Sequence, residues 1–252
     1  MEGGLRARNL PNVHDAIIRK LREHSNLNAS DVAIIRRLPH TERKLASHED
    51  VVRQGDRPTV SAVVFDGMVA RYHTLATGKR QYLSFHITGD MPDVQALFID
   101  TMDHAVCALD AAVVSLIPHS ALLPLLQESA SVAFAVWRET LIDAAIFREA
   151  ITNNSARPPR VRLAHLFCEQ YYRARAGNYS HPGSCSLPLS QTQLGETLGL
   201  SLPTVSRALQ WLRRLGVVDF HRGELRVRNW QRLAAVADFD PSYLHLRKPP
   251  EL

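Results

Sequence analysis

The sequence predicts an α+β protein in which a small antiparallel β-domain precedes one long helix and a compact, basic helical unit. Short apolar runs separated by turn residues fill residues 51–118, which is typical of an antiparallel roll or sandwich. A long amphipathic run covers residues 124–153, and two short amphipathic runs meet at a corner near residue 200. We therefore divide the chain into an N-terminal arm at 1–28, a roll-like domain at 29–122, a long helix with its hinge at 123–156, a basic domain at 157–235 and a tail at 236–252.

Charge is distributed unevenly along the chain. The formal net charge of the 252 residues is +5, with 45% hydrophobic and 22% charged residues, as in ordinary globular proteins. Residues 157–232 contain 12 arginines, no lysine and 4 acidic residues, a net of +8, so the remainder carries −3. A basic region on a slightly acidic body indicates a polyanionic partner, nucleic acid first, although a merely soluble basic domain has the same charge.

The cysteines and the N-terminal residues indicate the cellular compartment in which the protein is expected. Cys107, Cys168 and Cys185 have no CxxC spacing, so neither a disulfide framework nor a cysteine zinc site is indicated. The start "MEGGLRARNLPNVHDAIIRKL" lacks the apolar core of a signal peptide, and no apolar run is long enough for a membrane helix. We expect a cytoplasmic protein without a membrane partner. Cys107 or Cys185 is a candidate oxidation target, since Cys185 lies in a Ser- and Gly-rich loop; a spare thiol is the alternative.

The first half of the chain contains the predicted helices of the arm and the predicted strands. A short helix is expected around Asp15–Arg22, and a helical pattern recurs within 29–50. Strands follow in "VSAVVFDGMVARYH", "LATGKRQYLSFHITGD" and "HAVCALDAAVVSLIP", with turns at Asp66-Gly67 and Thr77-Gly78.

The long amphipathic run predicts a helix that begins near Pro124. Its apolar positions recur at spacings of three and four, as in a coiled-coil seam. We expect this stripe either to form a homodimer interface or to lie on its own domain; its residues are Ala133, Val136, Thr140, Ala144, Phe147 and Ile151. The stretch "TNNSARPPR" then breaks the helix and acts as a hinge.

The stretch "LSQTQLGETLGLSLPTVSRALQWLRRLG" predicts two helices around a tight corner. Ser190 and Gln193 form a capping-box pattern, Gly199 suits the left-handed position that ends a helix, and Ser201 with Pro203 suits the start of the next. In the second helix Val205 and Leu209 begin the buried stripe, so a second face is left for guanidinium and amide groups.

This pattern indicates a winged helix-turn-helix that reads double-stranded DNA. A helix fits the major groove, and Arg pairs bidentately with guanine. The hairpin around Arg222-Gly223 supplies the wing, where Arg222, Arg226 and Arg228 are expected at phosphates. A two-helix packing unit with a solvated face is the alternative. The candidate DNA-binding residues are Gln191, Thr192, Leu202, Pro203, Thr204, Ser206, Arg207, Gln210, Arg214 and Arg222.

These residues resemble the Crp/Fnr transcription regulators, most closely the Fnr and FixK side. "LGETLGLSLPTVSRALQWLRRLGVV" is similar to the family's reader motif, including its Ser-Arg pair at Ser206 and Arg207. "GMVARYHTLATGKRQYLSFHITGDMPDVQALF" resembles the family's β-roll sensor segment. The resemblance covers about residues 30–232 and implies a cyclic-nucleotide-binding-like roll, a dimerisation helix at 124–153, a homodimer on a pseudo-palindromic site, and contact with RNA polymerase.

Departures from the family pattern concern the effector. Cyclic-nucleotide binders carry a Glu for the ribose hydroxyls and an Arg-Ser/Thr pair for the cyclic phosphate, but here Val94, His104 and Ala105 stand at those positions. Without these contacts we expect no useful affinity for cAMP or cGMP. Leaving the ribose hydroxyls without hydrogen-bond partners alone costs roughly 1 to 3 kcal/mol of binding free energy. No cysteine precedes Cys107, so an Fnr-type iron–sulfur cluster is not expected. A haem ligand among His73, His86 and His104 is a further possibility that we do not favour over ordinary hydrogen-bonded histidines.

A departure in the reader helix concerns the operator. Relatives usually carry Glu where Pro203 stands, and Glu accepts a hydrogen bond from cytosine. We therefore expect a half-site that keeps the guanine read by Arg207 but differs beside it.

The sequence thus predicts a homodimeric transcription regulator, with activation as the preferred sign and an unknown small molecule as the possible effector. The alternative is a small-molecule sensor of the same fold whose DNA binding is weak or lost, which Pro203 favours. We do not expect an enzyme, because GxSxG, HExxH, a P-loop and GxGxxG after a strand are all missing.

Overall fold

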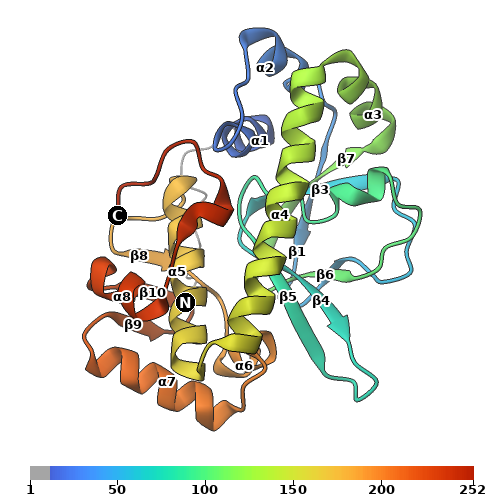
Figure 1. Ribbon diagram of the computed structural model, residues 1–252. Helices are drawn as coiled ribbons and strands as arrows, with labels where there is room; N and C mark the ends of the chain where they lie inside the picture. The colour runs from blue at the N-terminus through green and yellow to red at the C-terminus, as the bar shows by residue number, and fades with distance from the viewer. Residues whose placement is uncertain (1–11) are drawn as a thin grey trace, which may run out of the picture. The chain divides into compact units, whose positions relative to one another are not determined.

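The computed structural model describes residues 12–252, which divide into two compact units (Figure 1). The first unit comprises the described residues up to His73 together with Leu83–Leu141. The second comprises Thr74–Tyr82 and Ile142–Leu252. Residues 1–11 of the predicted arm lie outside the described residues.

Helices and strands alternate in the first half of the chain as the sequence predicts for an α+β protein. The elements are α1 (Val13–Arg22), α2 (Ala29–Ile35), β1 (Thr41–Leu45), β2 (Asp50–Val52), β3 (Val60–Asp66), β4 (Val69–Thr74), β5 (Arg80–His86), the 3-10 turn η1 (Val94–Leu97), β6 (Ala105–Ala108), β7 (Ala112–Pro118), α3 (His119–Glu128) and α4 (Ala130–Ala156).

Two small sheets form the roll. One has the strand order β1-β7-β3 and the other β2-β6-β4-β5. β7 pairs antiparallel with both neighbours, for example Val114 with Arg43 and with Val64. The predicted turn at Asp66-Gly67 is confirmed: Gly67 has φ 83°, and a Cβ there would lie 2.9 Å from the carbonyl oxygen of Ala111. Alternate residues of a strand point to the same face of a sheet, and the residues that do so in the roll form a mainly aliphatic core.

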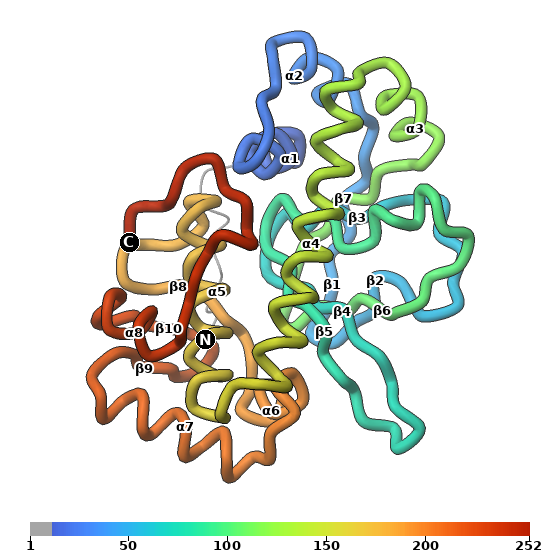
Figure 2. Tube along the Cα trace, in the orientation of Figure 1, coloured from blue at the N-terminus to red at the C-terminus, as the bar shows by residue number. Residues whose placement is uncertain are grey.

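The helices α1, α2, α3 and the first half of α4 share a second core on one face of the roll. Val13, Ile17, Ile35 and Leu122 are buried there against Val63 and Ile117. In Figures 1 and 2 these helices gather around the N-terminal half of α4. The described part of the arm is therefore folded onto the roll domain.

We expected the long helix to begin near Pro124, and this prediction was wrong. Pro124 lies inside α3, and a separate helix α4 begins after Ser129, whose backbone is extended. The Ser129 hydroxyl oxygen accepts a hydrogen bond from the Val132 N–H and its own hydrogen goes to Asp31, 2.8 Å away. A tertiary contact with α2 thus places the break, which local propensity did not reveal.

The second unit is built around α5. Its elements are α5 (Pro159–Ala176), β8 (Ser184–Ser186), α6 (Gln191–Leu198), α7 (Leu202–Arg214), β9 (Val218–His221), β10 (Glu224–Val227), α8 (Trp230–Ala237) and the 3-10 turn η2 (Pro241–Leu244). α5 packs against α7 and α8, and the strands form a sheet in the order β8-β10-β9. Phe167, Leu198, Leu212 and Leu233 are fully buried between these elements.

The predicted tail is a packed segment. The boundary expected at residue 235 falls inside α8, and Leu244 is buried with Ile142, Ile146 and Tyr172. The Tyr243 hydroxyl donates to Glu169 Oε2 at 2.9 Å. Aromatic residues at wide spacing were too weak a pattern to predict this packing.

Among residues 12–252, no helix combines the length and apolar character that crossing a membrane requires.

Candidate nucleic-acid interface and effector segment

The corner between α6 and α7 follows from its caps. The Ser190 hydroxyl accepts from the Gln193 N–H, and the Gln193 side chain accepts from the Ser190 N–H, so the predicted capping box is confirmed. Gly199 has φ 64° and ends α6 in the left-handed region. Ser201 occupies the N-cap of α7, but its hydroxyl bonds the Thr204 hydroxyl instead of a backbone N–H, unlike the predicted cap.

Gly195 is a structural requirement that the sequence analysis missed. A Cβ at this position would lie 2.6 Å from the carbonyl oxygen of Leu200. Only glycine therefore lets the chain after the corner pass this close to α6. A glycine inside a helical pattern, four residues before the corner glycine, was the available signal.

The reader face of α7 is exposed as predicted. Val205, Ala208 and Leu212 are buried, which holds the helix on its own domain. The candidate residues lie outside this stripe: Leu202, Pro203, Arg207, Gln210 and Arg214 are exposed, Thr204 and Ser206 are half-buried, and Gln191 and Thr192 at the start of α6 are exposed. The Arg207 guanidinium donates to the Thr204 hydroxyl at 3.1 Å, which orients it along the helix.

The wing is a two-residue hairpin. β9 and β10 pair antiparallel, and both turn residues have positive φ: 48° at Arg222 and 75° at Gly223. Arg222 is exposed at the tip, as expected for a phosphate contact. Arg226 and Arg228, also expected at phosphates, pair with Glu224 and Asp219 at 3.0 Å. Their charge is partly neutralised within the domain.

A groove beside the reader helix was not predicted. It has a volume of about 490 Å³ and lies between the start of α5 and α7. Its walls include Pro159, Thr204 and Arg207, and the Arg160 guanidinium stands 5.2 Å from the ring centre of Trp211. Among the described residues, no acidic side chain lines it. The groove therefore offers two guanidinium groups and an aromatic surface next to the exposed face of α7.

The three residues at the expected effector-pocket positions are all buried in the roll. Val94 is buried in η1, and Ala105 is buried in β6. His104 is also buried; its Nδ1 lies 2.6 Å from Asp103 Oδ1 and its Nε2 lies 3.2 Å from Gln95 Nε2. Burial and the charge of Arg71 lower the pKa of His104, despite the opposing effect of Asp103.

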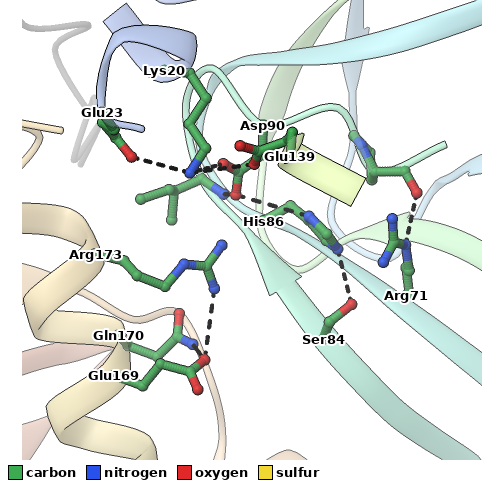
Figure 3. Close-up of polar contacts among 12 residues, drawn as sticks. Lys20, Glu23, Arg71, Ser84, His86, Asp90, Glu139, Glu169, Gln170 and Arg173 are labelled. Carbon is green, nitrogen blue, oxygen red and sulfur yellow. Dashed lines mark hydrogen bonds and ion pairs between the residues drawn. The ribbon is translucent and has the colours of Figure 1, made fainter. Parts of the chain in front are cut away.

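Arg71 is the cation of this region that the sequence analysis missed. It projects from β4, is only 4% exposed, and its Nε donates to the carbonyl oxygen of Pro92 at 2.7 Å (Figure 3). Beside it, both carboxylate oxygens of Asp93 accept from the Ala62 N–H, at 2.8 and 3.1 Å. The guanidinium group thus comes from a strand and not from position 104.

Two family domains match the chain in the regions just described. Residues 161–236 match the Crp-like helix-turn-helix domain, and residues 42–129 match the cyclic nucleotide-binding domain. The chain belongs to the Crp/Fnr family of transcription regulators.

Individual relatives agree with this membership of the Crp/Fnr family. The chain is 22% identical over 235 residues to the transcriptional activator protein anr of Pseudomonas aeruginosa, covering 92% of this chain and 96% of that protein. It is 22% identical over 220 residues to the anaerobic regulatory protein of Aggregatibacter actinomycetemcomitans, covering 87% and 85%. The structure of FixK2 from Bradyrhizobium japonicum is similar with a TM-score of 0.71 and 27% identity, covering 79% of this chain and 98% of that one.

In this Crp/Fnr protein the exposed stripe of α4 is displaced from the predicted seam. Phe134, Trp137, Leu141 and Ile151 are the large exposed apolar residues of α4, and the half-buried Ala144 and the exposed Arg148 complete their heptad spacing. We call these six residues the α4 stripe. Ala144 and Ile151 were predicted; Ala133, Val136, Thr140 and Phe147 are half-buried beside the stripe, and Val136 packs on the core of the first unit. Two apolar stripes share the helix, and the pattern alone did not distinguish them.

The cysteines lie where oxidation is hindered. We expected Cys185 to lie in a flexible loop. It lies instead in β8, where it is 4% exposed. Burial raises the pKa of its thiol to about 12, and the Glu224 charge adds to this effect. Cys107 is fully buried in β6. Because the thiolate is the reactive species, this environment favours spare structural thiols.

Asp93 should make the stability of the fold depend on pH. Burial raises its pKa to about 7, although the Ala62 hydrogen bonds and Arg71 oppose the shift. An unfolded Asp titrates near 3.9, so the stability from this group is complete below about pH 4 and is lost as the pH rises through 7. Between pH 5.5 and 8 the loss amounts to about 2 kcal/mol of unfolding free energy.

Urea unfolding of the wild type and of Asp93→Asn at pH 5.5 and 8 tests this prediction. The free energy of unfolding of Asp93→Asn should lack the decrease of about 2 kcal/mol between the two pH values. Asp100→Asn, at an exposed position, is the control and should follow the wild type. Equal pH dependence in Asp93→Asn and wild type would contradict the assignment.

Proposed function

We propose that the protein is a homodimeric transcription activator that binds a pseudo-palindromic double-stranded DNA site and is not controlled by cAMP. The observation that carries the proposal is the exposed face of α7, where Arg207 stands beside Thr204 on a helix held by a buried apolar stripe. Such a helix fits the major groove, and its guanidinium group reads guanine. In a dimer, the two reader helices would lie about 34 Å apart, one turn of DNA.

The α4 stripe supports the homodimer. Its large apolar members leave water only if a partner covers them, and their heptad spacing suits a second copy of the same helix. A two-fold pair of helices also explains a pseudo-palindromic operator, because operator symmetry mirrors protein symmetry. The sign of regulation follows the name of the relative in Pseudomonas aeruginosa, a transcriptional activator, and RNA polymerase is then the second partner. We propose regulation without catalysis.

The test of the proposal is selection of bound duplexes from random DNA by the full chain, with and without a small-molecule extract of cells. We expect an enriched two-fold motif with a guanine in each half-site and a changed neighbour where Pro203 replaces the family's Glu. Enrichment that needs the extract would reveal an effector. If no motif is enriched under either condition, the chain is a sensor of this fold without DNA reading.

We expect cAMP and cGMP to bind no better than millimolar. Val94 offers no acceptor to ribose hydroxyls, and the buried His104 is held by Asp103 and Gln95. Isothermal titration calorimetry of the wild type with each nucleotide measures this. Micromolar affinity for either would overturn the cAMP-independent proposal. We likewise propose a protein without an iron–sulfur cluster, since the chain has no cysteine before Cys107.

The groove next to the reader helix should hold DNA backbone. Its described lining includes Arg160 and Arg207 and no acidic residue, and its volume of about 490 Å³ leaves room for a phosphate group. We expect Arg160→Gln to weaken binding roughly tenfold to all sequences alike, and to reduce the salt slope by about 2 for the dimer.

Fluorescence titrations at several salt concentrations, on the selected site and on scrambled DNA, measure this effect. Arg57→Gln removes an equal charge from an exposed position in the first unit and is the control. An unchanged salt slope in Arg160→Gln would remove the groove from the DNA-binding surface.

A further inference from the structure

Lys20, near the end of α1, is buried and has no role in the proposed DNA binding. Most of the buried surface of α1 is apolar, with Val13, Ile17 and Leu21 in the helical core. Lys20 nevertheless lies in the same interface and is 8% exposed. A lysine is almost never buried this deeply unless it is paired, because the lost hydration of its charge is costly.

Carboxylates from three elements surround the Lys20 ammonium group. Its Nζ lies 3.0 Å from Asp90 Oδ1 in the turn after β5, 3.5 Å from Glu139 Oε1 on α4, and 3.2 Å from Glu23 Oε2 just after α1 (Figure 3). His86 at the end of β5 faces Asp90 as well, at 3.8 Å. Lys20 thus joins the arm, the roll and the long helix at one point.

A second pair of contacts grips the same turn of α4. His24 Nε2 lies 2.6 Å from Glu139 Oε2, and the Arg138 guanidinium donates to the carbonyl oxygen of His24 at 2.9 Å. Together with Lys20, the arm therefore holds two consecutive residues of α4. The residue immediately before them is Trp137, a member of the α4 stripe.

This grip constrains the rotation of α4. A buried ion pair is favourable only in a geometry that satisfies its charges. A rotation of one residue would carry Glu139 away from Lys20 and His24 and leave charge buried without a partner. The same rotation would turn Phe134, Trp137 and Leu141 out of their common outward direction.

We propose that Lys20 and His24 are positioning residues for the dimer interface: the arm helix α1 clamps α4 through Glu139 and Arg138 so that the α4 stripe faces the second copy of the chain. The inference rests on the proposed homodimer. It gives the arm a defined role, which is to set the orientation of the helix that pairs the two subunits. DNA binding then depends on the arm indirectly, because only a correctly paired dimer presents both reader helices.

The test is the dimer dissociation constant of full-length variants by sedimentation, together with DNA affinity by fluorescence titration. Lys20→Gln removes the charge, and we expect it to raise the dimer dissociation constant roughly tenfold or more and to weaken DNA binding in parallel. Lys20→Arg keeps the charge and should restore most of both. Arg36→Gln is the matched control, since it breaks the pair between Asp15 of the same arm and Arg36 at the end of α2, an arginine that is 53% exposed.

Glu139→Gln provides the second variant, because its amide still offers hydrogen bonds and is the gentler change if Lys20→Gln is poorly folded by circular dichroism. We expect Glu139→Gln also to weaken dimerisation while circular dichroism stays native. If folded Lys20→Gln or Glu139→Gln dimerises and binds DNA like Arg36→Gln, the clamp has no positioning role. A monomeric wild type would instead refute the proposed homodimer itself.

Discussion

Replacing Arg207 by Ala should relax the guanine preference of the operator and weaken binding to it by about 1 to 3 kcal/mol per half-site. Arg207 is exposed on α7 and its guanidinium is oriented by Thr204, so its removal should delete the two proposed hydrogen bonds to guanine without disturbing the core. With two half-sites per dimer, the loss should reach roughly 30-fold or more. Titration on the selected site, and a second random selection with the variant, measure affinity and preference.

Arg213→Ala is the control for this experiment. Arg213 lies on the same helix, is not one of the candidate DNA-binding residues, and pairs with Asp219 of β9 at 3.5 Å. Its loss should lower affinity for all sequences slightly and leave the selected motif unchanged. If Arg207→Ala retains both the affinity and the motif of the wild type, α7 does not read bases through this residue.

Leu141→Glu should convert the protein into a monomer at concentrations where the wild type is a dimer. Leu141 is 53% exposed in the centre of the α4 stripe. In a two-fold pair the variant would lose the burial of two leucines and bring two carboxylates together in an apolar interface. We expect the dimer dissociation constant to rise roughly 100-fold or more, with a parallel loss of affinity for the two-fold DNA site.

Leu123→Glu separates this effect from a general effect of new surface charge. Leu123 is 37% exposed on α3, outside the stripe, so the same substitution there should leave the oligomeric state unchanged. Sedimentation velocity of both variants at several concentrations is the measurement. A dimeric Leu141→Glu would place the subunit interface elsewhere.

Local signals predicted the elements with the strongest caps and turns. The corner of the second unit depends on Ser190, Gln193 and Gly199, whose preferences act within a few residues of themselves, and the structure confirms it. The wing tip at Arg222-Gly223 and the roll turn at Gly67 are confirmed for the same reason. The outward direction of the candidate residues on α7 could be predicted because the buried stripe has a clear helical period.

Contacts between distant residues decided the rest. The break at Ser129 depends on Asp31 of α2, and the cation beside the effector segment is Arg71 from β4. The groove of Arg160 and Trp211 joins residues about 50 positions apart. No short-range pattern records such pairings, which is why they were missed.

The sequence by itself determined the order of the elements, the helix-turn-helix corner and the residues that face outward on its second helix, because caps, turns and helical periodicity act locally. Only the tertiary structure decided which of two apolar stripes on α4 remains exposed, since that depends on which one the core of each unit covers. The burial of Lys20 among Glu23, Asp90 and Glu139 was decided in the same way, because a charge becomes partnered only when separate elements meet.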